Sequence, residues 1–193
     1  MAKRKVAKQK VAKKKGTAHK GRAKTSARRA AKRAAKPSKR AAPAAVSAAA
    51  SATPYLCCKG ASAALDFYRK AFGAQERMRV AGKDGSIGHA DIAIEGASIM
   101  LSDEWPEGGV FSPQTLGGSA VTIHLYVRDV DAFTDRAVSA GASLLRPVAD
   151  MPYGDRSASL RDPFGHRWNF ATKKEEVSKQ EMERRFGGAF LVT

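Results

Sequence analysis

The chain has 193 residues and a formal net charge of +17, and its only cysteines are the adjacent Cys57 and Cys58. It has no apolar run long enough to cross a bilayer and no secretory apolar region, so we expect neither a membrane span nor secretion. Adjacent cysteines are poorly placed to form a disulfide, so we expect an intracellular, cytoplasmic protein in which both side chains pack within a strand.

The positive charge is concentrated at the N-terminus. Residues 1–53 hold 18 of the 35 Lys and Arg side chains and no acid, whereas residues 54–193 hold the other 17 against all 18 Asp and Glu. The larger aliphatic side chains of this tail beyond Met1 are only Val6, Val11 and Val46. Burying this small apolar surface would not offset the loss of chain entropy on folding. We therefore expect a disordered basic tail over residues 1–40 and an Ala-rich linker over residues 41–52.

A tail of this kind neutralises phosphates and releases their counterions, which predicts salt-sensitive, sequence-independent binding to DNA or RNA. In composition it resembles the tails of linker histones and bacterial histone-like proteins, and binding to DNA would associate the protein with the nucleoid. An organelle transit peptide and a solvated tail with no specific partner remain alternatives. The basic residues expected to contact phosphates are Lys3, Arg4, Lys5, Lys13, Lys14, Lys15, Arg28, Arg29, Lys32, Arg33, Lys39 and Arg40.

Periodic structure begins at Thr53. The segment TPYLCCK predicts a strand, and SAALDFYRKAFGA predicts a helix in which Leu65, Tyr68 and Phe72 recur at helical spacing before Gly73 ends it. The segments ERMRV, GHADIAI and SIMLSD, separated by the turn signals KDG and EG, predict three more strands. The first half of the folded region is therefore a βαβββ unit.

A stretch rich in Gly, Pro and Ser follows, over residues 104–118. It predicts a loop without regular structure, and Trp105 lies near its start. Two interpretations stay open: a mobile flap that covers a site, and a plain surface loop.

The second half repeats the order of the first. The segment VTIHLYV predicts a strand, DVDAFTDRAVSAGA a helix that ends at Gly141, and SLLRPV, RSASLRD and HRWNFA three strands, with DPFG as a turn. Strand alternation places Trp168 and Phe170 on one face for packing. We therefore predict an α+β fold of two paired βαβββ modules whose sheets form a cup.

The chain ends with a short helical signal. Ser178 followed by Glu181 predicts a capping box at the start of a helix over SKQEMERRF, so residues 177–193 form a C-terminal helix and end.

The motifs PYLCCKGASAALDFYRKAFGA, GSIGHADIAIEGASIMLSDE, HLYVRDVDAF and YGDRSASLRDPFGHRWNFAT resemble the vicinal oxygen chelate superfamily over residues 53–176. That superfamily includes glyoxalase I, extradiol dioxygenases and bleomycin-resistance proteins, and the likeness is to its PhnB-like branch. The resemblance implies a homodimer that binds or transforms a small molecule in its cup. As an enzyme, such a protein would be a lyase, an isomerase or a dioxygenase.

The resemblance also implies a divalent metal held by side chains from the first and last strands of each module. Those positions are occupied here by Thr53, Met100, Thr122 and Asn169. Thr and Asn bind divalent ions weakly and Met is a soft thioether, so the usual metal centre is expected to be absent.

Other polar side chains remain in the predicted cup. We predict that His89 and His124 are the catalytic groups, as general acid and base or, with Asp91, as ligands of a displaced divalent metal. His166 lies in the turn and is interpreted as structural, and Asp155 and Arg156, in the loop entering the last hairpin, could instead pair with each other. The expected ligand-binding residues are Tyr55, Asp91, Met100, Tyr126, Tyr153, Arg156 and Asn169.

Three functions follow from these features. The first is a small-molecule cup, without the usual metal, joined to a nucleic-acid-binding tail. The second is a metal-dependent enzyme with atypical ligands. The third is a DNA-associated interaction protein in which the folded domain is catalytically inactive.

Overall fold

The computed structural model describes residues 51–189. All predictions for the basic tail and for residues 41–50 of the linker therefore lie outside the described residues. No helix in residues 51–189 combines the length and the apolar character that crossing a membrane requires.

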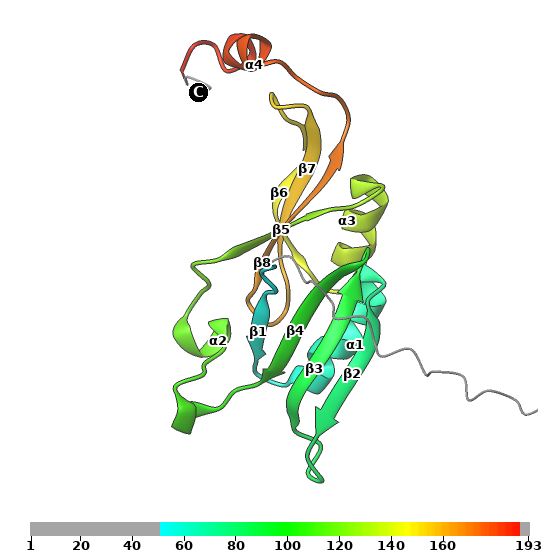
Figure 1. Ribbon diagram of the computed structural model, residues 1–193, viewed down its shortest axis with the longest axis vertical. Coiled ribbons are helices and arrows are strands. Elements are labelled where there is room, and N and C mark those ends of the chain that lie inside the picture. Colours follow the sequence, from blue (N-terminus) through cyan, green and yellow to red (C-terminus); the bar gives the residue numbers. More distant parts are fainter. Residues whose placement is uncertain (1–50, 190–193) are drawn as a thin grey trace, which may run out of the picture. The chain divides into compact units, whose positions relative to one another are not determined.

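The first module forms a four-stranded sheet with one long helix (Figure 1). The Asp103 carboxylate accepts hydrogen bonds from the backbone N–H groups of Gly60 and Ala61 (3.1 and 2.6 Å), so a residue of the last strand caps the helix at its start. In chain order the elements are β1 (Tyr55–Cys58), α1 (Ala61–Phe72), β2 (Gln75–Ala81), β3 (Ile87–Ile94) and β4 (Ala97–Asp103).

The second module has the same composition and follows a connecting segment. Asp129 caps its long helix by accepting a hydrogen bond from the N–H of Ala132 (3.1 Å). The elements are β5 (Thr122–Tyr126), α3 (Val130–Ser139), β6 (Ser143–Asp150), β7 (Asp155–Arg161) and β8 (Arg167–Lys173).

The two sheets share one topology. Their strand orders are β1-β4-β3-β2 and β5-β8-β7-β6, and in each sheet the first strand of the module lies parallel to the last while the other neighbours are antiparallel. The predicted α+β fold with two copies of a βαβββ unit is therefore confirmed.

The sequence predicted one of three local features correctly, the C-terminal helix, and missed the structure of the segment after β4 and of the start of β7. The stretch after β4 contains two short helices, η1 (Pro106–Gly108) and α2 (Pro113–Leu116), rather than loop alone. The C-terminal helix α4 (Lys179–Arg185) forms as predicted, with the Ser178 hydroxyl accepting a hydrogen bond from the N–H of Glu181 (3.2 Å). Asp155 and Arg156 were expected in a loop, but they begin strand β7 because Asp155 pairs with Lys173 of β8.

The hydrophobic core lies on the helix-facing sides of both sheets. The Phe72 ring of α1 stacks on Phe133 of α3 (centroids 5.5 Å apart) and meets Trp168 and Phe170 of β8 edge-on at 5.0 and 5.1 Å. Both β8 side chains are fully buried, as the alternation predicted. The two modules therefore share one aromatic core, because the helix of the first packs against the sheet of the second.

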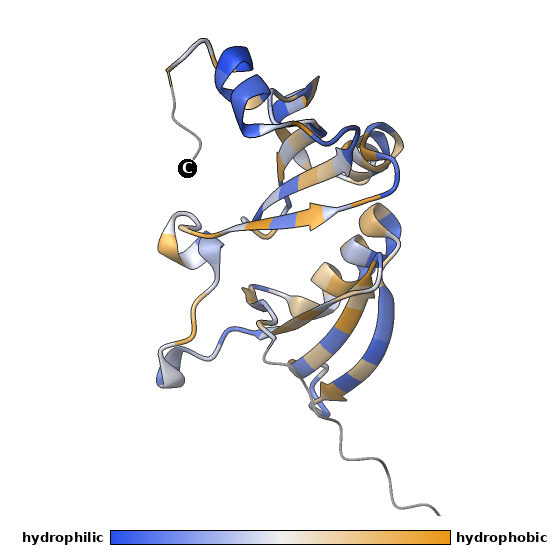
Figure 2. Ribbon diagram, turned by 45° about the horizontal axis from the view of Figure 1, so that its top comes forward, coloured by the Kyte–Doolittle hydropathy of each residue, from blue (hydrophilic) through white to orange (hydrophobic). Residues whose placement is uncertain are grey.

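The other side of each sheet carries no helix of its own module, and we call it the open face. Along the strands apolar and polar residues alternate (Figure 2), so each sheet has one face that packs and one that can meet solvent or a ligand. Several large side chains on the open faces are about half exposed, namely Tyr55 (52%), Met78 (50%), Val80 (55%) and Tyr126 (55%).

Candidate functional site

The open face of the first sheet carries a tyrosine and histidine pair. Leu56 and Cys58 of β1 point into the core, so Tyr55 points to the open face, and the same alternation in β3 brings His89 there. The Tyr55 hydroxyl lies 2.8 Å from His89 Nδ1, and the two ring centroids are 5.4 Å apart. These two predicted site residues are therefore in direct contact.

Asp91 and Met100 lie next to this pair. The register places Met100 of β4 between Tyr55 of β1 and Asp91 of β3. Arg77 Nη1 lies 4.0 Å from Asp91 Oδ1, and this buried oxygen has no hydrogen-bond partner among the described residues. The open face of the first sheet therefore mixes an aromatic, a thioether and a carboxylate with an unused acceptor atom.

The open face of the second sheet carries a connected network around Asn169. Asn169 Oδ1 accepts hydrogen bonds from Arg146 Nη2 (3.1 Å) and from the Ser159 hydroxyl (2.9 Å), and Asn169 Nδ2 lies 2.8 Å from His124 Nδ1. Because the amide oxygen already faces two donors, the amide nitrogen must donate to His124 Nδ1. The proton of the neutral His124 ring is therefore on Nε2, where it can donate to a ligand.

Arg146 fixes this network, although it was not among the predicted site residues. Its guanidinium also donates to the Ser157 hydroxyl (2.9 Å) and carbonyl (3.3 Å), so it is held by two strands. The available signal was an arginine inside the otherwise apolar strand segment SLLRPV, where a charged side chain needs a partner.

A tyrosine and carboxylate pair lies on the same open face. The Tyr126 hydroxyl donates to Asp155 Oδ2 (2.9 Å), and this hydrogen bond, with burial, raises the pKa of Tyr126. Asp155 is 3% exposed, and its Oδ1 has no hydrogen-bond partner among residues 51–189. Tyr153, another predicted ligand-binding residue, lies just before β7 in the preceding turn and is half-buried.

Arg156 does not belong to the open face. Its guanidinium donates to both carboxylate oxygens of Asp131 in α3 (2.7 Å each) and to Asp150 (3.1 Å), and these bonds raise its pKa further above its ordinary value. It therefore lies on the side of the sheet that packs against α3, opposite His124. The prediction of Arg156 as a cup residue is wrong, because adjacent strand residues point to opposite faces and Asp155 occupies the open face. The alternative that Arg156 pairs with Asp155 is also wrong, since Asp155 binds Tyr126.

The positions where a metal centre would be expected do not fit one. Met100, Thr122 and Asn169 lie on the open faces and Thr53 precedes β1, and their thioether, hydroxyl and amide groups are poor ligands for a divalent ion. Within residues 51–189 no three His, Cys, Asp or Glu side chains gather as metal ligands. No hydrogen bond, ion pair or ring contact among the described residues joins His89 and Asp91 to His124, which belong to different sheets.

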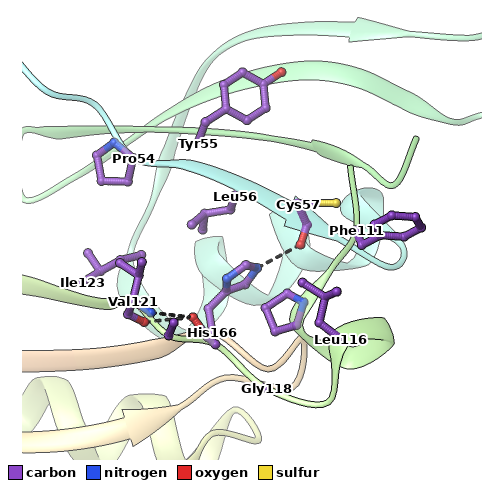
Figure 3. A pocket seen from close by; sticks show the side chains of 13 residues that line it. Pro54, Tyr55, Leu56, Cys57, Phe111, Leu116, Gly118, Val121, Ile123 and His166 are labelled. Atoms are coloured by element: carbon purple, nitrogen blue, oxygen red, sulfur yellow. Dashed lines mark hydrogen bonds between the residues drawn. The ribbon is translucent and has the colours of Figure 1, made fainter. Parts of the chain in front are cut away.

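His166 lies in a hollow of about 420 Å³ beside strand β1 (Figure 3). Its Nε2 donates to the Cys57 carbonyl (3.1 Å) and lies 3.7 Å from Cys58 Sγ, and the ring is 6% exposed. Burial lowers the pKa of His166 and raises the pKa of both cysteine thiols, so all three side chains are uncharged at neutral pH.

The segment over residues 104–118 is held together by hydrogen bonds within itself. The Glu104 carboxylate accepts a hydrogen bond from the N–H of Ser112 (2.8 Å), and hydrogen bonds from Thr115 and Ser112 lower the pKa of Glu104 to about 2. Trp105 pairs through its backbone with Val110, and its side chain is 62% exposed. A role for this segment as a flap stays a prediction.

Relatives share most of the folded region. The uncharacterized protein Rv0887c of Mycobacterium tuberculosis is 43% identical over 134 residues, which is 68% of this chain and 79% of that protein. Among solved structures, TioX from Micromonospora sp. ML1 is 26% identical over 67% of this chain and all of that one, with a TM-score of 0.53. The At5g48480 product of Arabidopsis thaliana is 28% identical over 64% of this chain and 99% of that one, with a TM-score of 0.52.

The family comparison agrees with the duplicated βαβββ architecture and with the resemblance in the motifs. The matching model is that of the Glyoxalase/Bleomycin resistance protein/Dioxygenase superfamily, and it aligns with residues 49–170. The chain therefore belongs to this superfamily.

Proposed function

We propose that this protein binds a small organic molecule on the open faces of its sheets and that its basic tail holds it on nucleic acid. The observation that carries the first part is the network of His124, Asn169 and Arg146 on an uncovered sheet face. Side chains that fix one another in this way are positioned before a ligand arrives, which lowers the entropy cost of binding. Domain bounds of 53–176 for the binding unit belong to the same proposal.

In this proposal the two histidines have different surroundings. His124 offers an Nε2–H donor to a carbonyl or carboxylate oxygen of the ligand, and His89 shares its Nδ1 with the Tyr55 hydroxyl. Both are the acid and base candidates if the ligand is transformed. Tyr126, Met100 and Asp91 supply the remaining contacts with the ligand.

We also propose that a second copy of the chain completes the cup. Each copy has two open faces, and the exposed Tyr55 and Val80 leave apolar surface on the first of them. A two-fold axis that places the first sheet of one copy over the second sheet of the other makes the same contact twice and closes the assembly. Such a dimer brings His89 of one copy toward His124 of its partner.

Sedimentation velocity and thermal unfolding test this part together. The full chain is expected to sediment as a dimer, and Val80→Asp, which puts a charge on the open face without touching the core, is expected to give monomers. A thermal-shift screen of small carboxylic acids and ketones is expected to give ligands that stabilise the wild type but not His124→Ala. A ligand that stabilises both proteins equally would refute the assignment of His124.

The charge of the N-terminal region supports the proposed binding to nucleic acid, since residues 1–53 hold 18 Lys and Arg side chains and no acid. Binding to duplex DNA is expected for the full chain and not for a chain that lacks residues 1–52. Equal affinity of the two for the same duplex would contradict the proposal, and circular dichroism of the shortened chain controls for loss of fold.

A further inference from the structure

Two arginines face each other across the hairpin of β7 and β8. Arg161 and Arg167 are direct partners in the antiparallel register, lie on the open face and are exposed. Like charges directly opposite each other in a sheet are destabilising, so such a pair gains stability from a negative charge nearby. Among the described residues neither guanidinium has a hydrogen bond or an ion pair.

The nearest acid in the sequence cannot serve as that partner. Asp162 is 3% exposed, and its Oδ1 accepts hydrogen bonds from the N–H groups of Phe164 and His166 (2.9 Å each). Its Oδ2 accepts from the Tyr68 hydroxyl and from Trp168 Nε1 (2.8 and 2.9 Å). Both carboxylate oxygens of Asp162 are therefore already engaged, so neither is free to bind Arg161 or Arg167.

Arg161 and Arg167 line a hollow of about 300 Å³. Gly118, Ser119 and Gly165 line the same hollow. The backbone N–H groups of Gly118 and Ser119 have no hydrogen-bond partner among residues 51–189, so they remain available as donors.

The glycine-containing segment is held against the hairpin. Gln114 Nε2 donates to the Pro163 carbonyl (2.9 Å), which ties α2 to the turn. Gly165 has φ +91°, and a Cβ added there would lie 2.9 Å from Pro113 Cβ, so the two backbones approach closely. Helix α2, which precedes Gly118 and Ser119, is therefore held against the turn between β7 and β8.

We infer that this hollow is a binding site for a tetrahedral oxyanion, the phosphate group of a small phosphorylated molecule. Two forked guanidinium groups can bind several phosphate oxygens at once, and free backbone N–H groups add donors without adding charge. The bound anion would also relieve the repulsion between Arg161 and Arg167. The inference goes beyond the proposed function, since one copy of the chain supplies every group of the site.

Thermal unfolding of the full chain in inorganic phosphate, against chloride at the same ionic strength, tests the inference. Phosphate is expected to raise the melting temperature of the wild type more than that of Arg161→Gln/Arg167→Gln. Without phosphate, this double variant is expected to melt at or above the wild-type temperature, because it lacks the like-charge repulsion. The variant Lys70→Gln/Arg128→Gln removes two positive charges elsewhere on the domain and is expected to respond to phosphate like the wild type.

Each outcome decides the inference. An equal gain in melting temperature for the wild type and the Arg161/Arg167 double variant would overturn it, because phosphate also stabilises proteins by exclusion from their surface. Titration with a short DNA duplex distinguishes the source of the phosphate: equal duplex affinity for both proteins supports a small ligand. A duplex affinity that falls at least tenfold only in the Arg161/Arg167 variant, without any response to inorganic phosphate, would assign the arginines to nucleic acid and refute the small-ligand site.

Discussion

The Tyr68 hydroxyl donates a hydrogen bond to Asp162 Oδ2 across 2.8 Å, and both residues are buried. Tyr68 belongs to helix α1 of the first module, whereas Asp162 begins the turn between β7 and β8 of the second. Because Trp168 Nε1 donates to the same oxygen, the carboxylate joins the two modules at the aromatic core. Burial and the nearby Asp162 raise the pKa of Tyr68 well above its ordinary value, so the hydroxyl stays a donor.

This bond should be measurable in stability. Tyr68→Phe is expected to lower the free energy of unfolding by about 1.5–3 kcal/mol, the range for a hydrogen bond to a charged group. Urea denaturation followed by tryptophan fluorescence measures it, with Tyr55→Phe on the open face as the control, for which a change within about 0.5 kcal/mol is expected. Asp162→Asn should cost more than Tyr68→Phe, since an amide NH₂ would face groups that already donate. Equal stability of Tyr68→Phe and the wild type would show that the bond is not a joint between the modules.

The close approach at Gly165 makes a second prediction. Gly165 and Gly96 have nearly the same backbone angle (φ +91° and +90°), but only at Gly165 would a Cβ meet another residue, Pro113 at 2.9 Å. Gly96→Ala is expected to cost about 1–2 kcal/mol for the left-handed backbone alone. Gly165→Ala should cost clearly more and displace α2. Similar losses of unfolding free energy for the two variants would mean that the segment after Pro113 moves aside without a measurable energy cost.

Helical spacing, strand alternation and the repeated order of elements were enough to predict the fold and the faces of most strand residues. The spacing of Tyr68 and Phe72 predicted α1, and the alternation of Trp168 and Phe170 predicted which side of β8 is buried. What alternation could not predict was the partner across the core, because contacts between Phe72 and Trp168 depend on how the two modules pack. The sequence also placed His89 and His124 in different modules, but it could not predict that α1 and α3 pack against each other between those modules.

Among the site residues too, some positions could be predicted from strand alternation and others could not. Pairs within one sheet, such as Tyr55 with His89 and His124 with Asn169, are neighbours whose faces follow from parity. Arg156 was misplaced because the start of β7 was taken for a loop, where parity does not apply. Arg146 was missed because its partners, Ser157 and Asn169, lie on two other strands; the arginine within SLLRPV signals that a partner is needed but not which one.

The pKa of His166 predicts loss of stability in mild acid. Burial lowers the pKa of its imidazole in the folded protein, partly opposed by Asp162, whereas the unfolded chain keeps an ordinary value of about 6.5. Stability is therefore complete above that value and falls as the pH drops through it, because the unfolded state takes up the proton first. Urea denaturation between pH 7.5 and 5.5 should show this slope, and His166→Gln should flatten it. Carboxylates with lowered pKa, such as Asp131, act below about pH 4.5 and so lie outside this window.

The hydrogen bonds of Asn169 predict the tautomer of His124. In the wild type, long-range ¹H–¹⁵N correlation at alkaline pH should find the ring proton on Nε2. In Asn169→Asp a carboxylate oxygen faces Nδ1, so the proton should move to Nδ1. Ser159→Ala removes one donor to Asn169 and leaves Arg146, so it should keep the wild-type tautomer. The same tautomer in the wild type and Asn169→Asp would disprove the donor and acceptor assignment on which the His124 site depends.

The charge of the tail predicts how duplex binding depends on salt. Each phosphate that a Lys or Arg neutralises contributes about −0.9 to the slope of log affinity against log salt concentration. If six to ten of the 18 basic residues among residues 1–53 engage at once, affinity should fall about 10³- to 10⁵-fold between 50 and 200 mM salt. Fluorescence anisotropy with duplexes of unrelated sequence measures both this slope and its independence of sequence. A control chain with Lys13, Lys14 and Lys15 changed to Gln should lose up to about three contacts and show a correspondingly shallower slope. A flat salt response would mean that the tail, despite its charge, does not bind duplex DNA through phosphates.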